Sequence, residues 1–215
     1  MSRIAIIGGH GKVALHLASK LTAGKQQVTS IFRNPDHTDE VTATGAEPVV
    51  ADIENSSVDD IAGLLVGHYA VVFAAGAGGG NPARTYAVDR DAAIRVVDAA
   101  KQAGVRRFVM VSYFGAGPDH GVPEDNSFYA YAQAKAAADE YLKRSELDWT
   151  ILGPGGLTLD AATGKIDVGS EAASGNVSRE DVALVAAAVL ADDSTIGRTI
   201  EFNNGDTPIA EAVKA

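Results

Sequence analysis

Short apolar runs alternate along the chain with stretches in which apolar residues recur every three or four positions. The first run, Ile4–Ile7, has the length of a buried strand and ends in glycines. The apolar residues after the glycines have the spacing of one helix face, at Ala14, Leu17, Ala18 and Leu21. This pattern predicts a strand that turns sharply into a helix, which is the first half of a βαβ unit.

The same alternation continues through most of the 215 residues. Apolar runs predict further strands at residues 27–32, 48–51, 70–74, 107–112 and 149–152, and helical spacing predicts helices from residue 57, at 86–103 and at 127–145. A less regular C-terminal quarter predicts a strand at 165–168, a helix at 178–191 and a final strand at 199–202. Five βα repeats predict an α/β fold: one Rossmann-like domain over residues 1–215, with a doubly wound parallel sheet in a three-layer αβα arrangement. Residues 154–215 are expected to form a small substrate-side region.

The glycines after the first strand have the spacing Gly8-x-x-Gly11-x-x-Ala14. Such a turn can aim free backbone N–H groups and the positive end of a helix at a phosphate, and a Cβ there would push the phosphate away. A glycine pattern alone also fits an ordinary tight turn. Because a strand precedes it and a helix follows it, the sequence favours a dinucleotide-binding turn.

Composition narrows the range of partners. The net charge of −10 opposes binding to a nucleic-acid backbone, and the absence of cysteine excludes disulfides and thiolate catalysis. Five histidines lie apart without ligand-like spacing, so we expect no metal site. No apolar run approaches the ~20 residues of a membrane span, and the first strand leaves no room for a signal peptide. We therefore expect a cytoplasmic protein, a monomer or weak homodimer, that binds a small molecule but neither nucleic acid nor a membrane.

The second predicted strand ends at Arg33. In dinucleotide folds this strand end faces the adenine ribose, where an acidic residue selects NAD and an arginine accepts the 2′-phosphate of NADP. Here the first charged residue is basic, and Lys12 lies in the glycine turn. The pattern favours NADP(H) over NAD(H), although a solvated surface arginine is the simpler alternative.

Ligand contacts are expected where the parallel strands end, because ligands of open α/β sheets bind outside the carboxyl ends of the strands. Asp52 could accept a hydrogen bond from an adenine amino group, or it could cap the next turn. The expected cofactor-binding residues at these strand ends are Gly8, Gly9, His10, Gly11, Lys12, Val13, Arg33, Asp52, Ile53, Ala74, Ala75, Gly76, Ser112, Pro154, Gly155 and Leu157.

Two glycine-containing segments lack any apolar period. Residues 77–84 and 114–126 are therefore predicted to be mobile loops that close over one end of the site.

Ser112 at a strand end, followed by Tyr131-x-x-x-Lys135, completes a set of motifs that resembles the short-chain dehydrogenase/reductase superfamily. The chain looks most like the atypical, NAD(P)H-binding, NmrA-like group, whose members are often labelled epimerase or dehydratase homologues. The likeness covers nearly the whole chain, through IAIIGGHGKVA, Arg33-Asn34-Pro35, Val50-Ala51-Asp52, Val105-Arg106-Arg107, Leu147–Leu152, Arg179–Ala183 and Gly197-Arg198-Thr199. It differs at Gly153, where relatives commonly have an arginine.

The resemblance implies that Ser112, Tyr131 and Lys135 carry out catalysis around a hydride transfer. Residues at i and i+4 share one helix face, so Lys135 is expected beside Tyr131. Its ammonium group would lower the pKa of the phenol, and it would also reach the nicotinamide ribose. Tyr131 could equally be a packing residue.

The sequence therefore predicts an NADPH-dependent oxidoreductase that reduces a small carbonyl, quinone or related acceptor. A non-catalytic NADP(H) sensor that acts through a protein partner is the main alternative. A nucleotide-sugar epimerase or dehydratase is less favoured, because the C-terminal part is short.

Overall fold

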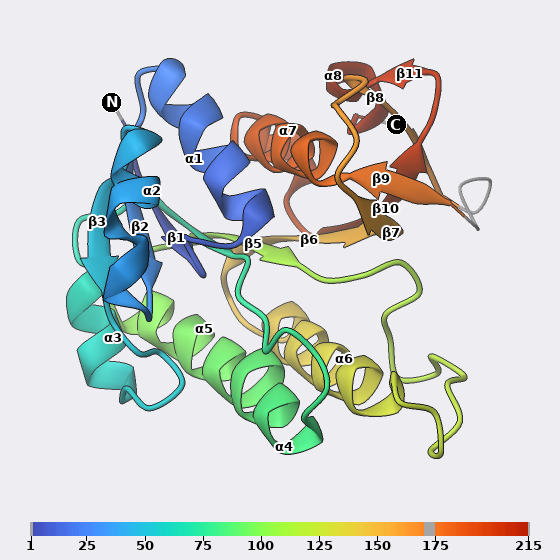
Figure 1. Ribbon diagram of the computed structural model, residues 1–215, viewed down its shortest axis with the longest axis horizontal. Coiled ribbons are helices and arrows are strands. Elements are labelled where there is room, and N and C mark those ends of the chain that lie inside the picture. Colours follow the sequence, from blue (N-terminus) through green and yellow to red (C-terminus); the bar gives the residue numbers. More distant parts are fainter. Residues whose placement is uncertain (1, 170–174, 215) are drawn as a thin grey trace.

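The computed structural model describes residues 2–169 and 175–214. In this part of the chain, a nine-stranded sheet lies between two layers of helices (Figure 1). Seven strands run parallel, in the order β3 (Glu47–Val50), β2 (Gln27–Phe32), β1 (Arg3–Ile7), β4 (Ala70–Phe73), β5 (Arg107–Val111), β6 (Asp148–Pro154) and β10 (Arg198–Asn204). The predicted Rossmann-like α/β domain is thereby confirmed.

The C-terminal region contains the predicted strand at residues 165–168 and adds short strands that the apolar pattern did not predict. Two strands continue the sheet in antiparallel pairing, β8 (Lys165–Val168) against β10 and β11 (Thr207–Pro208) against β8. Two others, β7 (Gly156–Thr158) and β9 (Asn176–Ser178), form a separate parallel pair. The strands β7, β9 and β11 have only two or three residues, which is too short to show a period, so the sequence did not predict them.

Each face of the sheet is covered by its own set of helices (Figure 1). Helices α1 (Lys12–Ala23) and α7 (Arg179–Leu190) cover one face, and α3 (Val58–Leu65), α5 (Ala93–Gln102) and α6 (Tyr129–Lys143) cover the other. Alternate side chains of β1 divide between the two cores, because successive strand residues point to opposite faces. Ile4 and Ile6 pack with α1 and α7, whereas Ala5 and Ile7 pack with α3 and α5. Three helices are short: α2 (Thr38–Ala43) packs against β3, α4 (Pro82–Thr85) against α6, and α8 (Ile209–Ala212) against α7 and β8.

The predicted helix at 86–103 is only half α-helical. Tyr86–Ala92 is π-helical, between α4 and α5. A π-helical turn holds one residue more than an α-helical turn, and such turns are frequent at functional sites. The wider turn brings the carboxyl group of Asp89 into the interior, where the residue is 2% exposed.

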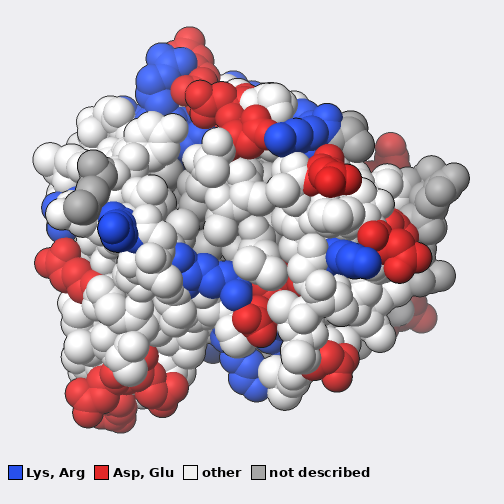
Figure 2. All heavy atoms as spheres, turned by 90° about the horizontal axis from the view of Figure 1, so that it is seen from above, with Lys and Arg blue, Asp and Glu red and all other residues white. Residues whose placement is uncertain are grey.

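The surface fits the acidic composition. On the face shown in Figure 2, blue and red side chains are interspersed, and the described residues there form no continuous basic surface. None of the helices in the described part of the chain has the length and apolar composition of a membrane span.

One buried arginine connects the two central strands to the helix layer above them. Arg107 on β5 is 3% exposed. Its Nη1 donates to the backbone oxygen of Asp148 at 2.8 Å, and its Nη2 donates to Thr150 Oγ1 at 2.9 Å and to the backbone oxygen of Val189 at 2.7 Å. Its hydrogen-bonding partners are neutral, so burial lowers the pKa of the guanidinium.

Replacing Arg107 by methionine should therefore destabilise the protein by about 2–4 kcal/mol, because several buried oxygens lose their donors. Urea unfolding measures the loss. Arg106→Met is the matched control, since Arg106 is exposed and only pairs with Asp148 at the surface. Equal unfolding midpoints for the two variants would contradict this account of Arg107.

Candidate functional site

The carboxyl ends of β1 and β4 form the floor of the site. Gly8 follows β1 with φ +82°, and a Cβ on it would lie 2.6 Å from the Cα of Ala75, which follows β4. A Cβ on Gly9 would lie 2.6 Å from the Cβ of Ser30 on β2. Both positions require glycine, so the turn passes directly between the ends of three strands. The strand order reverses at this point, and that is where open α/β sheets bind nucleotides.

Helix α1 presents an uncapped N-terminus to this turn. Gly11 is its N-cap, no side chain in the described residues caps it, and its first turn contains no acidic residue. By contrast, Ser57 and Asp60 form a capping box on α3, and Ser178 caps α7. The first N–H groups of α1 therefore remain available to an external anion. The glycine turn at residues 8–11 and the facing residues 74–76 form what we call the cofactor cradle. Because this cradle leads to an open helix N-terminus, it fits the pyrophosphate of a dinucleotide.

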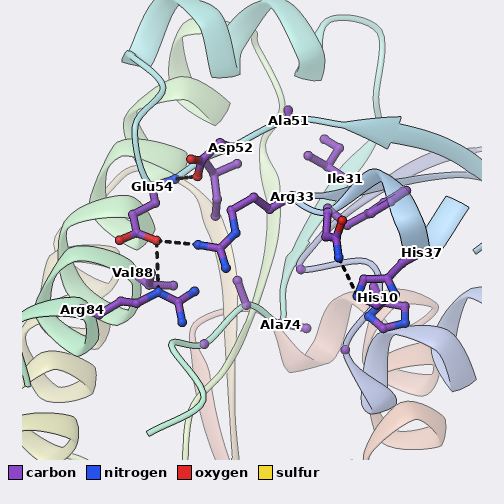
Figure 3. A pocket seen from close by; sticks show the side chains of 17 residues that line it. His10, Ile31, Arg33, His37, Ala51, Asp52, Glu54, Ala74, Arg84 and Val88 are labelled. Atoms are coloured by element: carbon purple, nitrogen blue, oxygen red, sulfur yellow. Dashed lines mark hydrogen bonds and ion pairs between the residues drawn. The ribbon is translucent and has the colours of Figure 1, made fainter. Parts of the chain in front are cut away.

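A first cavity of about 250 Å³ lies on one side of the cradle, over the ends of β1, β2 and β3 (Figure 3). This cavity brings together most of the residues that we expected to contact the adenosine part of a dinucleotide. Asp52 lines it and also caps the next turn, because its Oδ1 accepts from the backbone nitrogen of Glu54 at 3.1 Å. Both readings of Asp52 therefore remain compatible with its position. The expected residues among its lining are Gly8, His10, Gly11, Arg33, Asp52, Ile53, Ala74, Ala75 and Gly76.

Two arginines share one carboxylate in the first cavity. Arg33 Nη1 lies 3.2 Å from Glu54 Oε2, and Arg84 Nε lies 3.4 Å from the same oxygen (Figure 3). The sequence predicted Arg33 here but neither of its neighbours, because they come from different loops. Asp52 also lines this cavity, so two guanidinium groups face two carboxyl groups there, and in the described contacts both arginines pair with Glu54. Lys12 is exposed and is not among the residues that line the described cavities.

Two histidines that are distant in sequence stack at the edge of the first cavity. The rings of His10 and His37 are parallel, with centroids 3.5 Å apart (Figure 3). Glu40 Oε2 lies 3.1 Å from His10 Nε2, so the three residues form a group with the composition of a metal site. The spacing of the histidines in the sequence did not indicate this group. His37 meets His10 only because the loop after β2 folds back onto the glycine turn.

A second cavity, of about 650 Å³, continues on the other side of the cradle. It shares Ser112, Phe128, Tyr131 and Leu157 with a third cavity of about 540 Å³, which Pro154 and Gly155 also line. Val13 and residues 74–76 line the second cavity too, so the cofactor cradle and the predicted catalytic groups face one space.

The predicted catalytic residues Ser112 and Lys135 are both tied to protein groups. Ser112 Oγ donates to Asp139 Oδ2. Lys135 is 1% exposed, and its Nζ donates to the backbone oxygen of Val111 at 2.7 Å. The sequence missed Asp139, although it follows Lys135 by four residues and Tyr131 by eight and thus lies on the same helix face. Lys135 lies beneath the second cavity rather than on its wall.

Tyr131 lines both the second and third cavities, beside other aromatic rings. Its ring centroid is 5.2 Å from that of Phe128 and 5.5 Å from that of Tyr113. The prediction that Lys135 lowers its pKa is wrong in this structure. Burial raises the pKa of Tyr131, and the carboxyl groups of Asp89 and Asp139 raise it further.

Gly153 is the position at which the family resemblance led us to expect an arginine. A Cβ there would lie 3.0 Å from Glu201 Cγ and 3.2 Å from the backbone oxygen of Tyr113. An arginine would therefore not fit without displacing its neighbours. The glycine instead lets the strand β6 pass close to the segment after β5.

Comparisons with known proteins agree with this geometry. A family model described as NAD(P)H-binding matches residues 8–193. The chain is 35% identical to the "Uncharacterized sugar epimerase YhfK" of Bacillus subtilis, over 99% of each chain. Among solved structures, a putative NAD-dependent epimerase/dehydratase from Bacillus halodurans is 36% identical, with a TM-score of 0.91 over 100% of this chain and 99% of that one. The oxidoreductase ylbE from Lactococcus lactis is 30% identical, with a TM-score of 0.88 over 99% and 95%.

Gly8→Ala should weaken cofactor binding. A non-glycine residue at this φ costs about 1–3 kcal/mol, and the added methyl group collides with Ala75, so the cradle must open. We expect the Kd for NADP(H) to rise more than about tenfold in calorimetric titration.

Gly63→Ala is the matched control, because no heavy atom lies within 4 Å of its added Cβ. It should bind the cofactor as the unmodified protein does. A Gly8→Ala variant with unchanged affinity would show that the dinucleotide binds elsewhere.

Proposed function

The chain belongs to the NAD(P)H-binding family of atypical short-chain dehydrogenase/reductases, and on that premise we propose that it is an NADPH-dependent reductase of a small carbonyl, quinone or related acceptor. One observation carries the proposal most directly: Ser112 and Tyr131 line the same 650 Å³ cavity as residues 74–76 of the cofactor cradle. A nicotinamide ring that extends from the cradle would then share this space with an acceptor.

The protein groups have distinct roles in this proposal. Gly8 and the N-terminus of α1 hold the pyrophosphate, and the bound cofactor supplies a hydride. Tyr131 lines the second cavity, so its hydroxyl group can donate a proton to the oxygen of an acceptor bound there. Ser112 orients that oxygen, and Asp139 fixes the direction of the serine hydroxyl by accepting its hydrogen bond. Lys135 compensates the negative charge of Asp139 from below.

The substrate would bind between aromatic rings and the C-terminal region. The third cavity is lined by Tyr113, Phe114, Phe128 and Tyr131 on one side, and by Pro154, Gly155, Gly175 and Asn203 on the other. We propose that residues 154–215 thus supply the substrate side of the site. An acceptor with a flat apolar part fits such walls better than a highly hydroxylated sugar does.

A redox sensor remains the second candidate. The raised pKa of Tyr131 and the commitment of Ser112 to Asp139 are observations that favour binding without turnover. Loss of NADPH absorbance with a panel of aldehydes, quinones and flavins separates the two functions. Turnover of any acceptor supports the reductase, whereas tight cofactor binding without turnover of the whole panel supports the sensor.

The first cavity predicts a preference for NADP(H) over NAD(H). Charge-assisted hydrogen bonds contribute about 1.5–3 kcal/mol, or about ten- to a hundredfold in affinity, so Arg33→Ala should remove most of this preference. Glu54→Gln should strengthen NADP(H) binding, because the 2′-phosphate no longer competes with a carboxylate for the two arginines. Calorimetric titration of both cofactors measures each ratio.

Arg144→Ala is a control for net charge, since this arginine side chain is 81% exposed and lies outside the cavities. It should leave the ratio unchanged. Equal affinities of the unmodified protein for NADP(H) and NAD(H) would eliminate the assignment of the first cavity to a 2′-phosphate.

Tyr131→Phe should lower turnover of a confirmed carbonyl substrate by about 10²–10⁴-fold, because only the proton donor is lost. The Kd for NADPH should stay nearly constant, since the ring and its packing remain. Steady-state kinetics and calorimetry measure the two effects separately.

Tyr141→Phe is the matched control on the same helix. Its hydroxyl group donates to Asp98, away from the cavities, so the variant should keep full activity. If Tyr131→Phe also retained full activity, the proton would have to come from another group.

A further inference from the structure

Three buried ionisable side chains lie together beneath the second cavity. Asp89 and Asp139 are each 2% exposed, and Lys135 is 1% exposed. Lys135 and Asp139 come from α6, whereas Asp89 comes from the π-helical segment that packs against α6. Two carboxyl groups thus face one ammonium group in the interior. An uncompensated buried charge is costly, so the cluster is most stable when it holds one additional proton.

The contacts of the two carboxyl groups differ. Burial raises the pKa of Asp139, and the ammonium of Lys135, one helical turn before it, and the hydrogen bond from Ser112 oppose this rise. Asp89 Oδ2 accepts one backbone N–H, from Ala77 at 3.0 Å. Of these two described carboxyl groups, only that of Asp89 belongs to a residue that lines the second cavity. Asp89 is therefore the group that can exchange a proton with the site.

We propose that Asp89 stores a proton for the reaction: its carboxyl group is protonated while the nicotinamide is neutral, and it ionises when the nicotinamide becomes positively charged. The inference rests on the proposed function, because it places the nicotinamide in the second cavity. A positive ring in this cavity would replace the proton as the charge that compensates the second carboxylate.

The surrounding charges agree with this assignment. Burial raises the pKa of Asp89, and the N–H of Ala77, the ammonium of Lys135 and the guanidinium of Arg84 only partly oppose it. Arg84 is shared with Glu54 and donates to the backbone oxygen of Ala77, so it does not form an ion pair with Asp89 among the described contacts. The other titratable groups near the cluster are Tyr131, Glu140 and Lys143 on α6 and Tyr113 in the segment after β5.

In this proposal, one proton passes from Asp89 through Tyr131 to the acceptor during each reduction. A bound reduced cofactor would supply the hydride for the acceptor carbon and would then carry a positive charge, while Tyr131 gives its hydroxyl proton to the acceptor oxygen. Asp89 then passes its proton to the phenolate of Tyr131 and remains as a carboxylate beside the positive ring. When the oxidised cofactor leaves, Asp89 takes up a proton from solvent. The sum is one reduced cofactor, one acceptor and one proton converted to oxidised cofactor and alcohol or hydroquinone.

The test is the number of protons released when each cofactor binds. Calorimetric titrations in buffers with different ionisation enthalpies give this number without any turnover. We expect NADP⁺ to release more protons than NADPH, by up to one proton per site. Proton changes at the 2′-phosphate are common to both cofactors and cancel in the difference.

Asp89→Asn should remove the difference while both cofactors still bind, because an asparagine oxygen can still accept from Ala77. Asp91→Asn is the matched control: it lies in the same π-helical segment, pairs with Arg90 at the surface and should keep the difference. Retention of the difference in Asp89→Asn, or its loss in Asp139→Asn alone, would overturn the assignment to Asp89.

The unmodified protein provides an independent measurement if Asp89→Asn does not fold. Its infrared spectrum should contain the C=O stretch of a buried protonated carboxyl group, and this band should disappear when NADP⁺ binds but persist with NADPH. Equal proton release for the two cofactors would overturn the proposal that Asp89 stores a proton, and so would a carboxyl band that neither cofactor changes. Either result would leave the proposed function intact. Failure of both cofactors to bind overturns the proposed function and the proton store together.

Discussion

The close approach of the ends of β1 and β4 is the constraint on which the site depends. Gly8 lies so near Ala75 that a side chain on it would overlap the backbone, and its φ of +82° is one that other residues rarely adopt. The chain can therefore turn into α1 directly above the point where the strand order reverses. This single contact separates the first cavity from the second and leaves the N-terminus of α1 open between them.

Different physical requirements apply in the two cavities on either side of the glycine turn. The first cavity is partly exposed and contains ion pairs, because Arg33 and Arg84 share Glu54 there. The second cavity lies over buried charges that the solvent does not screen. A buried ammonium group near two buried carboxyl groups is most stable when the total charge is balanced, so in our proposal the protonation on this side depends on the charge of its ligand. The proposed cofactor recognition on one side and the proposed proton supply on the other both depend on this strand order.

The sequence predicted the parts of the site that depend on short-range pattern. The Gly8 turn, the strand end at Arg33 and the spacing of Tyr131 and Lys135 are all visible within a few residues. It did not predict contacts between loops, such as Glu54 with Arg33 or His37 with His10, because no local period places these residues together. Asp139 could have been found from its spacing to Tyr131 and Lys135. Asp89 could not, since its inward position requires a π-helical turn that the apolar pattern presents as an ordinary helix.

The most direct test of the account is a crystal structure of the protein with NADP⁺. The account predicts that the pyrophosphate lies on Gly8 and the N-terminus of α1, with the 2′-phosphate near Arg33. The nicotinamide should then lie in the second cavity with its C4 atom facing Tyr131 and Ser112. A nicotinamide ring outside that cavity, or a cofactor bound away from the glycine turn, would contradict the central claim that these residues form one hydride-transfer site.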